Sequence, residues 1–309
     1  MIAYAMPSKA DEYYQLVREV ILFIDRHHTH HPEKIDIAKA LNISQSDLQQ
    51  IFMAWGNMSP EQCLRYISKS YAKALLIKRS SLCSHHKYSF NRSKDLNLLI
   101  DFEPITPTEY NTMTEVFNIN YGTYMTRFGL CFIANTKRGI CHLSFLDEPQ
   151  TLEQPITLLT QQWPNALLNH NQSDISNLAE TIFNIHKTDQ ARLLVTPIKL
   201  LVKGTTFQQK VWKALINVHP GELASYNELA QIIQQPKATR AVASALARNN
   251  IAYLIPCHRV IKSNGELNQY HWGRERKAAI IAWEQANILT KHQATSKTFS
   301  TIYTDNNKT

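Results

Sequence analysis

The sequence lacks any apolar run that approaches the length of a membrane-spanning helix, which needs about 20 consecutive apolar residues. Its first residues, Met1–Met6, have neither a basic start nor a long apolar stretch, so we expect no secretory signal peptide. The five cysteines, at positions 63, 83, 131, 141 and 257, form no C-x-x-C pair. An odd, scattered set of thiols argues against a disulfide framework and a zinc ribbon, and it indicates a reducing cytosol.

Acidic side chains are scarce where basic ones gather. The formal net charge of the 309-residue chain is +8 and its isoelectric point is near 9.1, which favours a polyanionic partner. Residues 62–94 hold eight Lys or Arg and no Asp or Glu, and Arg65, Lys69 and Lys73 recur every four residues. That spacing stacks like charges on one helix face, which phosphate contacts would compensate. A solvated basic face is the alternative interpretation.

Residues 11–110 are predicted to be entirely helical. A short helix over 35–41, a turn at 42–43 and a helix over 44–55 with Ser44 as its N-cap form a helix-turn-helix. Ser59-Pro60 then opens a long helix over about 61–78. A similar helix start, Thr106-Pro107, lies 47 residues after Ser59-Pro60. This spacing suggests a duplicated helix-turn-helix, with its second unit over about 81–103.

Residues 119–200 predict an α/β region. Two apolar strands, 130–134 and 140–145, flank a hairpin connector, and helices are expected over 153–163 and 173–187. Cys131, Cys141 and His142 fit no usual zinc spacing, so core packing is the preferred interpretation. The polar residues 289–309 predict a disordered tail.

A further helix-turn-helix is predicted over 225–248. Ser225-x-x-Glu228 forms a capping box, Pro236 ends the first helix and Thr239 caps the second. One stripe of the second helix carries small residues behind a single arginine: Arg240, Ala243, Ser244 and Ala247. Such a face suits close approach to a DNA backbone or plain helix packing, and the pattern alone does not choose between them.

The hexapeptide Ile255-Pro256-Cys257-His258-Arg259-Val260 places a thiol beside an imidazole. The apolar run 251–255 before it predicts a buried strand that Pro256 ends. A neighbouring base can turn such a thiol into a nucleophile, whereas most free cysteines are only small buried hydrophobes.

The stretch 204–284 resembles the C-terminal domain of O6-alkylguanine-DNA alkyltransferases. The resemblance is carried by motifs in order: Gly204–Trp212, Pro220-Gly221-Glu222, Ser225-Tyr226, Lys237–Ala243, the hexapeptide, Gly265 and Tyr270. It implies suicidal repair of O6-methylguanine and O4-methylthymine in DNA, with Cys257 as the alkyl acceptor. It also implies that no metal or organic cofactor is needed, because the acceptor is the protein itself.

The same resemblance implies a role for each matched residue. His258 takes the thiol proton through a water, and Glu284 orients the histidine. Tyr226 presses on the flipped nucleotide, and Arg240 fills the space left in the duplex. Asn249 ties the recognition helix to the active-site turn, and Tyr270 lines the guanine pocket. His271, where the family varies, leaves the tolerance for bulky alkyl groups open.

Residues 11–110 resemble an AraC-type DNA-binding domain through Ile37-Ala38, Ser44, Leu48, Phe52, Gly56, Ser59-Pro60 and Ala72-x-x-Leu75-Leu76. The first recognition helix has no Lys or Arg, so we expect phosphate contact through Arg65, Lys69 and Lys73 rather than operator reading. The combination resembles Ada-type fusions, here without their N-terminal four-cysteine zinc domain.

The fold class we expect is therefore multidomain. An all-α AraC-type double helix-turn-helix domain (1–112) precedes an α/β alkyltransferase N-terminal domain (113–200). A mainly α, winged-helix-like catalytic domain (201–288) and the tail (289–309) follow.

The expected partner is double-stranded DNA containing O6-alkylguanine, bound by a monomer associated with the bacterial nucleoid. Two other functions stay open: an alkylation-responsive transcription regulator, and a non-catalytic lesion-binding protein. The presence of Cys257, His258 and Glu284 argues against the second.

Overall fold

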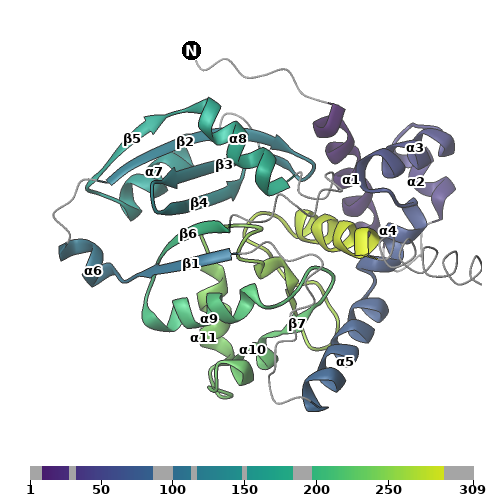
Figure 1. Ribbon diagram of the computed structural model, residues 1–309. Coiled ribbons are helices and arrows are strands. Elements are labelled where there is room, and N and C mark those ends of the chain that lie inside the picture. The colour runs from purple at the N-terminus through teal and green to yellow at the C-terminus, as the bar shows by residue number, and fades with distance from the viewer. Residues whose placement is uncertain are drawn as a thin grey trace, which may run out of the picture.

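A computed structural model describes residues 9–27, 33–85, 100–112, 117–147, 152–183 and 197–288 (Figure 1). The helices are α1 Lys9–Arg26, α2 Lys34–Ala40, α3 Gln45–Gly56, α4 Pro60–Ile67, α5 Lys69–His85, α6 Pro107–Thr112, α7 Glu153–Gln162, α8 Gln172–Phe183, α9 Thr206–Ile216, α10 Tyr226–Ile232, α11 Thr239–Ala247 and a final helix over 274–288. The strands are β1 Ile100–Ile105, β2 Phe117–Thr126, β3 Gly129–Thr136, β4 Gly139–Phe145, β5 Ala166–His170, β6 Ile198–Lys203, β7 Ala224–Ser225 and β8 Val260–Ile261. Among these residues no helix is long and apolar enough to span a membrane.

The first helix-turn-helix is confirmed as α2 and α3. The Ser44 hydroxyl accepts from Asp47 N at 3.0 Å, so it caps α3 as the sequence predicts. The Ser59-Pro60 start of α4 is also confirmed, with a reciprocal capping box between Ser59 and Gln62. The second unit, predicted over 81–103, falls largely outside the described residues, as do the N-terminal eight residues and the tail after 288.

The prediction of one long helix over 61–78 is wrong. The chain turns to an extended conformation at Ser68 (φ −68°, ψ 145°), which ends α4. The Ser68 hydroxyl then accepts from Tyr71 N at 3.3 Å and caps the start of α5. Side-chain bonds of this kind compete with a continuous helix. Arg65 therefore lies on α4 while Lys69 and Lys73 lie on α5, so the three do not share one helix face.

One six-stranded sheet has the order β1-β6-β4-β3-β2-β5. Strand β1 pairs in parallel with β6, from Ile100 opposite Ile198 to Ile105 opposite Lys203. The prediction that residues 11–110 are entirely helical is thus wrong over 100–105. The segment was missed because Asp, Glu and Pro interrupt its apolar pattern, which an edge strand tolerates. Thr106 does cap a helix, but that helix is the short α6 beside this sheet.

The predicted hairpin and helices of the α/β region are confirmed as β3, β4, α7 and α8. Side chains of β3 alternate between two cores, because successive residues of a strand point to opposite faces. Cys131 and Ile133 belong to the core that includes α8 and the C-terminal half. Phe132 and Ala134 belong to a second core, with Leu159 of α7. The two helices therefore cover opposite faces of the sheet.

Three local predictions in the C-terminal half are corrected. Residues 251–255 form buried turns rather than a strand, with Ile255 N donating to Ile251 O at 3.1 Å and Tyr253 at φ +65°. An apolar run alone does not distinguish a buried strand from a buried turn. Helix α11 has Ala238 at its N-cap and no side-chain cap, so Thr239 does not cap it. Ser225 caps α10, but Glu228 does not return the bond and contacts another helix instead.

The N-terminal helices pack directly on the rest of the chain. Trp55 of α3 donates from Nε1 to Arg127 O at 2.6 Å, and its ring meets Phe128 edge-on. Phe128 in turn meets Trp283 of the final helix edge-on. Figure 1 shows this final helix, in yellow, below the sheet and beside the N-terminal helices. One continuous core thus joins residues that the sequence assigned to separate modules.

Candidate active site

Cys257 opens a short 3-10 helix, Cys257–Arg259, directly after Pro256. The preceding turn is closed by one side chain, that of Asn249 at the end of α11. Its Oδ1 accepts from Ile251 N at 2.9 Å, and its Nδ2 donates to Ile255 O at 2.9 Å. The same Nδ2 lies 3.1 Å from the Cys257 sulfur. Asn249 thereby fixes the thiol relative to α11.

The thiol is buried, with 7% of the residue exposed. Burial raises the pKa of Cys257, while the Asn249 amide, the charge of Lys277 and the Tyr270 hydroxyl each act to lower it. Cys63, Cys131 and Cys141 are buried too, and their pKa values are raised by burial in much less polar surroundings. Of these four cysteines, Cys257 has the most neighbouring groups that act to lower its pKa.

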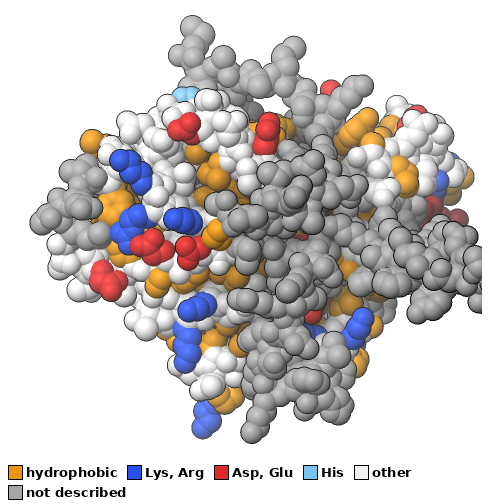
Figure 2. All heavy atoms as spheres, in the orientation of Figure 1, with side chains coloured by type: hydrophobic (Ala, Val, Ile, Leu, Met, Phe, Trp, Pro, Cys, Tyr) orange, Lys and Arg blue, Asp and Glu red, His pale blue; other side chains and the backbone are white. Residues whose placement is uncertain are grey.

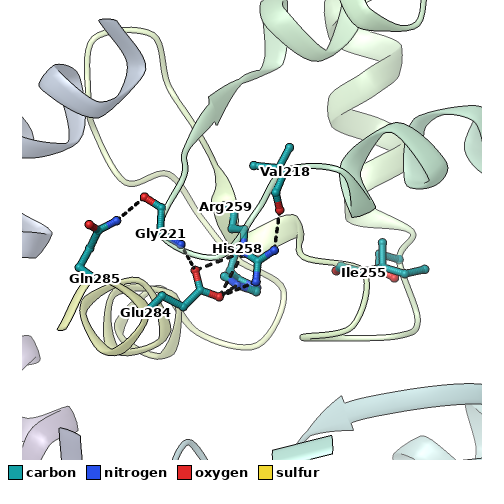
Figure 3. Close-up of polar contacts among 8 residues, drawn as sticks. Val218, Gly221, Ile255, His258, Arg259, Glu284 and Gln285 are labelled. Atoms are coloured by element: carbon teal, nitrogen blue, oxygen red, sulfur yellow. Dashed lines mark hydrogen bonds and ion pairs between the residues drawn. The ribbon is translucent and has the colours of Figure 1, made fainter. Parts of the chain in front are cut away.

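His258 and Glu284 meet as a buried pair. Nε2 of His258 lies 3.1 Å from Oε1 of Glu284, and both side chains are almost fully buried (Figure 3). Burial lowers the pKa of His258, although Glu284 acts to raise it, so the imidazole is neutral near pH 7. A neutral ring that donates from Nε2 to a carboxylate carries its lone pair on Nδ1. That Nδ1 is buried and has no hydrogen-bond partner among the described residues, which leaves it able to accept a proton.

Arg259 completes the charge balance around Glu284. Its guanidinium donates to the carboxylate from Nη2 at 2.7 Å and from Nε at 3.1 Å, and Nη1 donates to Val218 O at 2.5 Å. Burial by itself raises the pKa of Glu284, but Arg259 and then His258 outweigh burial and lower the pKa to about 2. Glu284 is therefore ionised throughout the physiological range.

The loop 218–222 holds the other side of this carboxylate. Gly221 N donates to Glu284 Oε2 at 3.2 Å, and Gly221 O accepts from Gln285 Nε2 at 2.5 Å (Figure 3). Gly221 has φ +76°, and a Cβ there would meet the terminal methyl of Ile288. The positive φ favours glycine at this position.

Two tyrosines flank the thiol. Tyr270 is buried, meets the His258 ring edge-on at 6.4 Å, and has a pKa raised by burial and by the charge of Cys257. Tyr226, the first residue of α10, is half-buried, and its hydroxyl accepts from Asn268 Nδ2. Burial raises the pKa of Tyr226 and the charge of Cys257 acts in the same direction, so both phenols stay protonated. The structure thus places Tyr226, Tyr270 and Asn249 around Cys257.

The sequence patterns did not single out two charged residues that the structure places at the site. Arg259 lies within the hexapeptide, and Lys277 begins the apolar run of the final helix. Lys277 Nζ donates to Val260 O at 2.6 Å and to Asn268 Oδ1 at 2.7 Å, and burial lowers its pKa to about 7. A lysine next to a continuous apolar run was the available signal, because lysine is almost never fully buried unless it is paired.

Helix α11 presents the small-residue face that its sequence pattern predicts. Arg240, Ala243, Ser244 and Ala247 are exposed, whereas Val242, Ala245 and Leu246 are buried. Trp212 of α9 donates from Nε1 to Ala245 O at 2.9 Å, which anchors the helix. Lys210, Lys213 and Lys237 are also exposed on α9 and on the loop before α11. Figure 2 shows Lys and Arg side chains over this lower part of the molecule.

The three basic residues expected to contact phosphate have neighbours other than the thiol. Lys69 forms an ion pair with Glu266 at 2.8 Å, and Arg65 lies against the ring of Tyr66. Lys73 is exposed, and its backbone lies close to Gly265. Their contact with phosphate stays a prediction. No group of three or more His, Cys, Asp or Glu that could hold a metal occurs among the described residues.

A buried thiol that contacts Asn249 and is followed in the chain by a neutral, carboxylate-oriented imidazole is typical of a nucleophilic-cysteine site. Its attachment, through Asn249, to a helix-turn-helix with an exposed small-residue face defines the class as a DNA-acting enzyme.

Comparisons with known proteins agree with this class. Residues 206–286 match the model of the 6-O-methylguanine DNA methyltransferase, DNA binding domain, and residues 119–181 match that of its ribonuclease-like domain. The Escherichia coli (strain K12) protein named bifunctional transcriptional activator/DNA repair enzyme Ada is 33% identical, across 81% of this chain and 70% of its own length. A methylated-DNA--protein-cysteine methyltransferase of Methanosarcina mazei is 36% identical, across 50% of this chain and 90% of its own.

A crystal structure of Mycobacterium tuberculosis O6-methylguanine methyltransferase aligns with 55% of this chain and 94% of its own, at 31% identity and a TM-score of 0.44. The chain belongs to the 6-O-methylguanine DNA methyltransferase family, as an Ada-type member. It is a DNA-binding repair enzyme of the methylated-DNA--protein-cysteine methyltransferase type.

Proposed function

We propose that this protein repairs O6-methylguanine and O4-methylthymine in double-stranded DNA by transferring the methyl group irreversibly to Cys257. The observation that carries the proposal is the contact of Asn249 with the Cys257 sulfur at 3.1 Å, next to the buried His258–Glu284 pair. The experiment is an intact-mass measurement after mixing with a duplex containing O6-methylguanine. One methyl group per chain supports the proposal, and many repaired lesions per chain would contradict it.

The proposed reaction is a direct displacement at carbon. The Cys257 proton passes to Nδ1 of His258 through one water, and Glu284 stabilises the imidazolium that forms. The thiolate attacks the methyl carbon, the bond from carbon to guanine O6 breaks, and the electron pair leaves on the guanine. Tyr226, protonated because burial raises its pKa, donates a proton to the leaving base. An S-methylcysteine and an unmodified guanine remain.

A buried thiol cannot reach a base inside a duplex, so the lesion must rotate out of the stack. We propose that α11 enters the minor groove through its exposed small residues and that Arg240, exposed near its start, fills the vacated space. Tyr226 presses on the phosphate of the flipped nucleotide, and Tyr270 lines the guanine pocket. Unstacking costs a few kcal/mol, and a weakly paired alkylated base costs least.

The variants Arg240→Ala and Tyr226→Ala are expected to slow methyl transfer from duplex DNA by about tenfold or more, which corresponds to about 1.4 kcal/mol of barrier. Transfer from free O6-methylguanine base should fall less, because the free base needs no flipping. Second-order rate constants with the two substrates test this difference. Lys213→Ala, a basic residue of α9, is the matched control and should keep the wild-type ratio of the two rates. Equal losses on both substrates would refute the assigned roles.

We propose that the N-terminal helices form an AraC-type DNA-binding domain, of which α2 and α3 are the first helix-turn-helix. In the proposed division an α/β domain and a catalytic domain follow, joined in one monomer. Because β1 is a strand of the α/β sheet, the first boundary belongs before residue 100 rather than at 112. The similarity to an Ada protein over 70% of that relative's length supports a second candidate function, alkylation-responsive regulation of transcription.

This domain is expected to bind DNA with little sequence preference. Helix α3 carries no Lys or Arg, and its exposed side chains include Gln50 and Met53. Selection from random duplexes should return a loose consensus that Gln50→Ala leaves unchanged. Lys73→Ala should weaken binding to all sequences alike and lower the salt slope by about one. A sharp operator motif bound at physiological salt would instead move the protein toward the regulator.

A further inference from the structure

Helix α5 of the N-terminal half lies against the catalytic half (Figure 1). Ala72 and Leu76 of α5 share a small buried core with Leu223, Ile261 and Ile281. The family models match residues 119–181 and 206–286, so α5 is outside the matched regions. The contacts of α5 with the catalytic half therefore come from outside the regions that the family models match.

Arg79 is the central polar residue of this contact. Only 8% of it is exposed, and its guanidinium binds two carboxylates that lie six residues apart in the chain. Nε donates to Glu228 Oε1 at 2.6 Å, and Nη1 pairs with Glu222 Oε2. A buried guanidinium is stable only when it is paired in this way, so Arg79 fixes both acids in place.

The Glu222 branch leads to Glu284. Glu222 Oε2 also accepts from His219 N at 3.1 Å, which closes the loop 218–222. That loop donates from Gly221 N to Glu284 Oε2 at 3.2 Å. Helix α5 holds the loop a second time, since Tyr71 donates to Gln285 Oε1 at 3.1 Å and Gln285 donates to Gly221 O at 2.5 Å.

The Glu228 branch leads to Tyr226. Both residues lie in the first turn of α10, where Ser225 accepts from Glu228 N at 3.1 Å. A Glu at this position ordinarily returns a bond to the cap residue. Here its carboxylate is directed to Arg79 instead, so the start of α10 is held from α5.

We propose that Arg79, supplied by the N-terminal half of the chain, is a positioning residue for methyl transfer. It positions Glu284 through the loop 218–222 and Tyr226 through α10. The inference rests on the proposed function. Arg79 touches neither the thiol nor the DNA base, and it acts through Glu222 and Glu228. The catalytic half thus depends on the N-terminal half for its rate of methyl transfer as well as for its affinity for DNA.

The test compares Arg79→Ala, Arg79→Lys and Glu228→Gln with wild type, by second-order rate constants on an O6-methylguanine duplex and on the free base. Arg79→Ala should lose about tenfold on the duplex, because displacements of the order of 1 Å cost up to about a hundredfold. The free base should show a smaller loss, through Glu284 and proton donation by Tyr226, because it needs no flipping. Arg79→Lys, which can bind one carboxylate at a time, should recover part of the rate. Glu228→Gln should slow the duplex reaction more than the free-base reaction, since Tyr226 presses on the flipped nucleotide only in the duplex.

Arg18→Ala is the matched control. Arg18 also joins an N-terminal helix to the catalytic half, through Glu275 at 3.1 Å, but it contacts neither the loop 218–222 nor α10. Thermal unfolding of each variant sets a temperature at which all are folded, and Arg18→Ala should then keep the wild-type rates. Wild-type duplex rates in Arg79→Ala, or an equal loss in Arg18→Ala, would overturn the proposal.

If Arg79→Ala does not fold, Glu228→Gln decides the matter, since an unchanged duplex rate there also overturns it. Failure of the proposed function is distinguishable, because wild type would then transfer no methyl group to Cys257 at all.

Discussion

Cys257→Ala is expected to abolish methyl transfer while leaving the fold and duplex binding intact. The sulfur is the proposed acceptor, and alanine removes it without disturbing the closed turn, since Asn249 still bonds to Ile251 N and Ile255 O. Intact mass after incubation with methylated duplex should stay that of the unmodified chain. Binding of the same duplex should match wild type.

The control for this result is a second buried cysteine. Cys141→Ala removes a thiol whose pKa is raised by burial and whose sulfur donates to Ala134 O at 3.5 Å. This variant should transfer one methyl group at the wild-type rate when it is assayed where it is folded. Methylation mapped to Cys63, Cys131 or Cys141 would refute Cys257 as the acceptor.

Glu284→Ala is expected to have the largest effect on stability. Removal of the carboxylate leaves Arg259, which is 8% exposed, without its counter-ion, and it leaves the Gly221 N–H without an acceptor. Breaking a buried ion pair from one side costs about 3–5 kcal/mol. Methyl transfer should fall sharply as well, since His258 loses its orienting partner. Denaturant unfolding and the rate on duplex DNA measure the two losses.

The pH dependence of that loss has a definite sign. The folded-state pKa of Glu284, about 2, lies below its ordinary value of 4.5, so folding favours the ionised form. This stabilisation is present above about pH 4.5 and is lost as the pH falls toward 2. The difference in unfolding free energy between wild type and Glu284→Gln, which keeps the shape of the side chain, should therefore shrink over that range. A difference that does not change between about pH 7 and pH 3 would show that Glu284 is not held as a carboxylate.

Much of the fold could be predicted from local signals in the sequence. Ser44, Ser59 and Ser225 cap the helices that they were expected to cap, because a cap depends on residues three positions away. Asn249, Tyr270 and Tyr226, which the resemblance assigns to the site, do lie around Cys257. Sequence order alone could not show that Asn249 closes the turn 251–255, so its apolar residues suggested a strand.

What the sequence could not predict depends on pairing between distant segments. Strand β1 is recognisable only once β6, nearly a hundred residues later, lies beside it. Arg79 belonged to a run of basic residues that suggested a phosphate-binding surface, yet its partners lie 143 and 149 residues away. Lys69 likewise pairs with Glu266. The number of charged residues predicted a positive net charge. It could not distinguish cations that face solvent from cations that join the N-terminal half to the catalytic half.

Strand β1 also limits how this chain can be divided. It covers the outer edge of β6, whose backbone groups it pairs from Ile198 to Lys203. A piece that began at Phe117 would leave that edge open, and an open strand edge is a template for pairing with other chains. The repair half therefore cannot be freed by cutting between β1 and β2 without exposing an aggregation-prone edge. The fusion is built into the sheet itself, so a protease that separated the halves cleanly would have to cut ahead of residue 100.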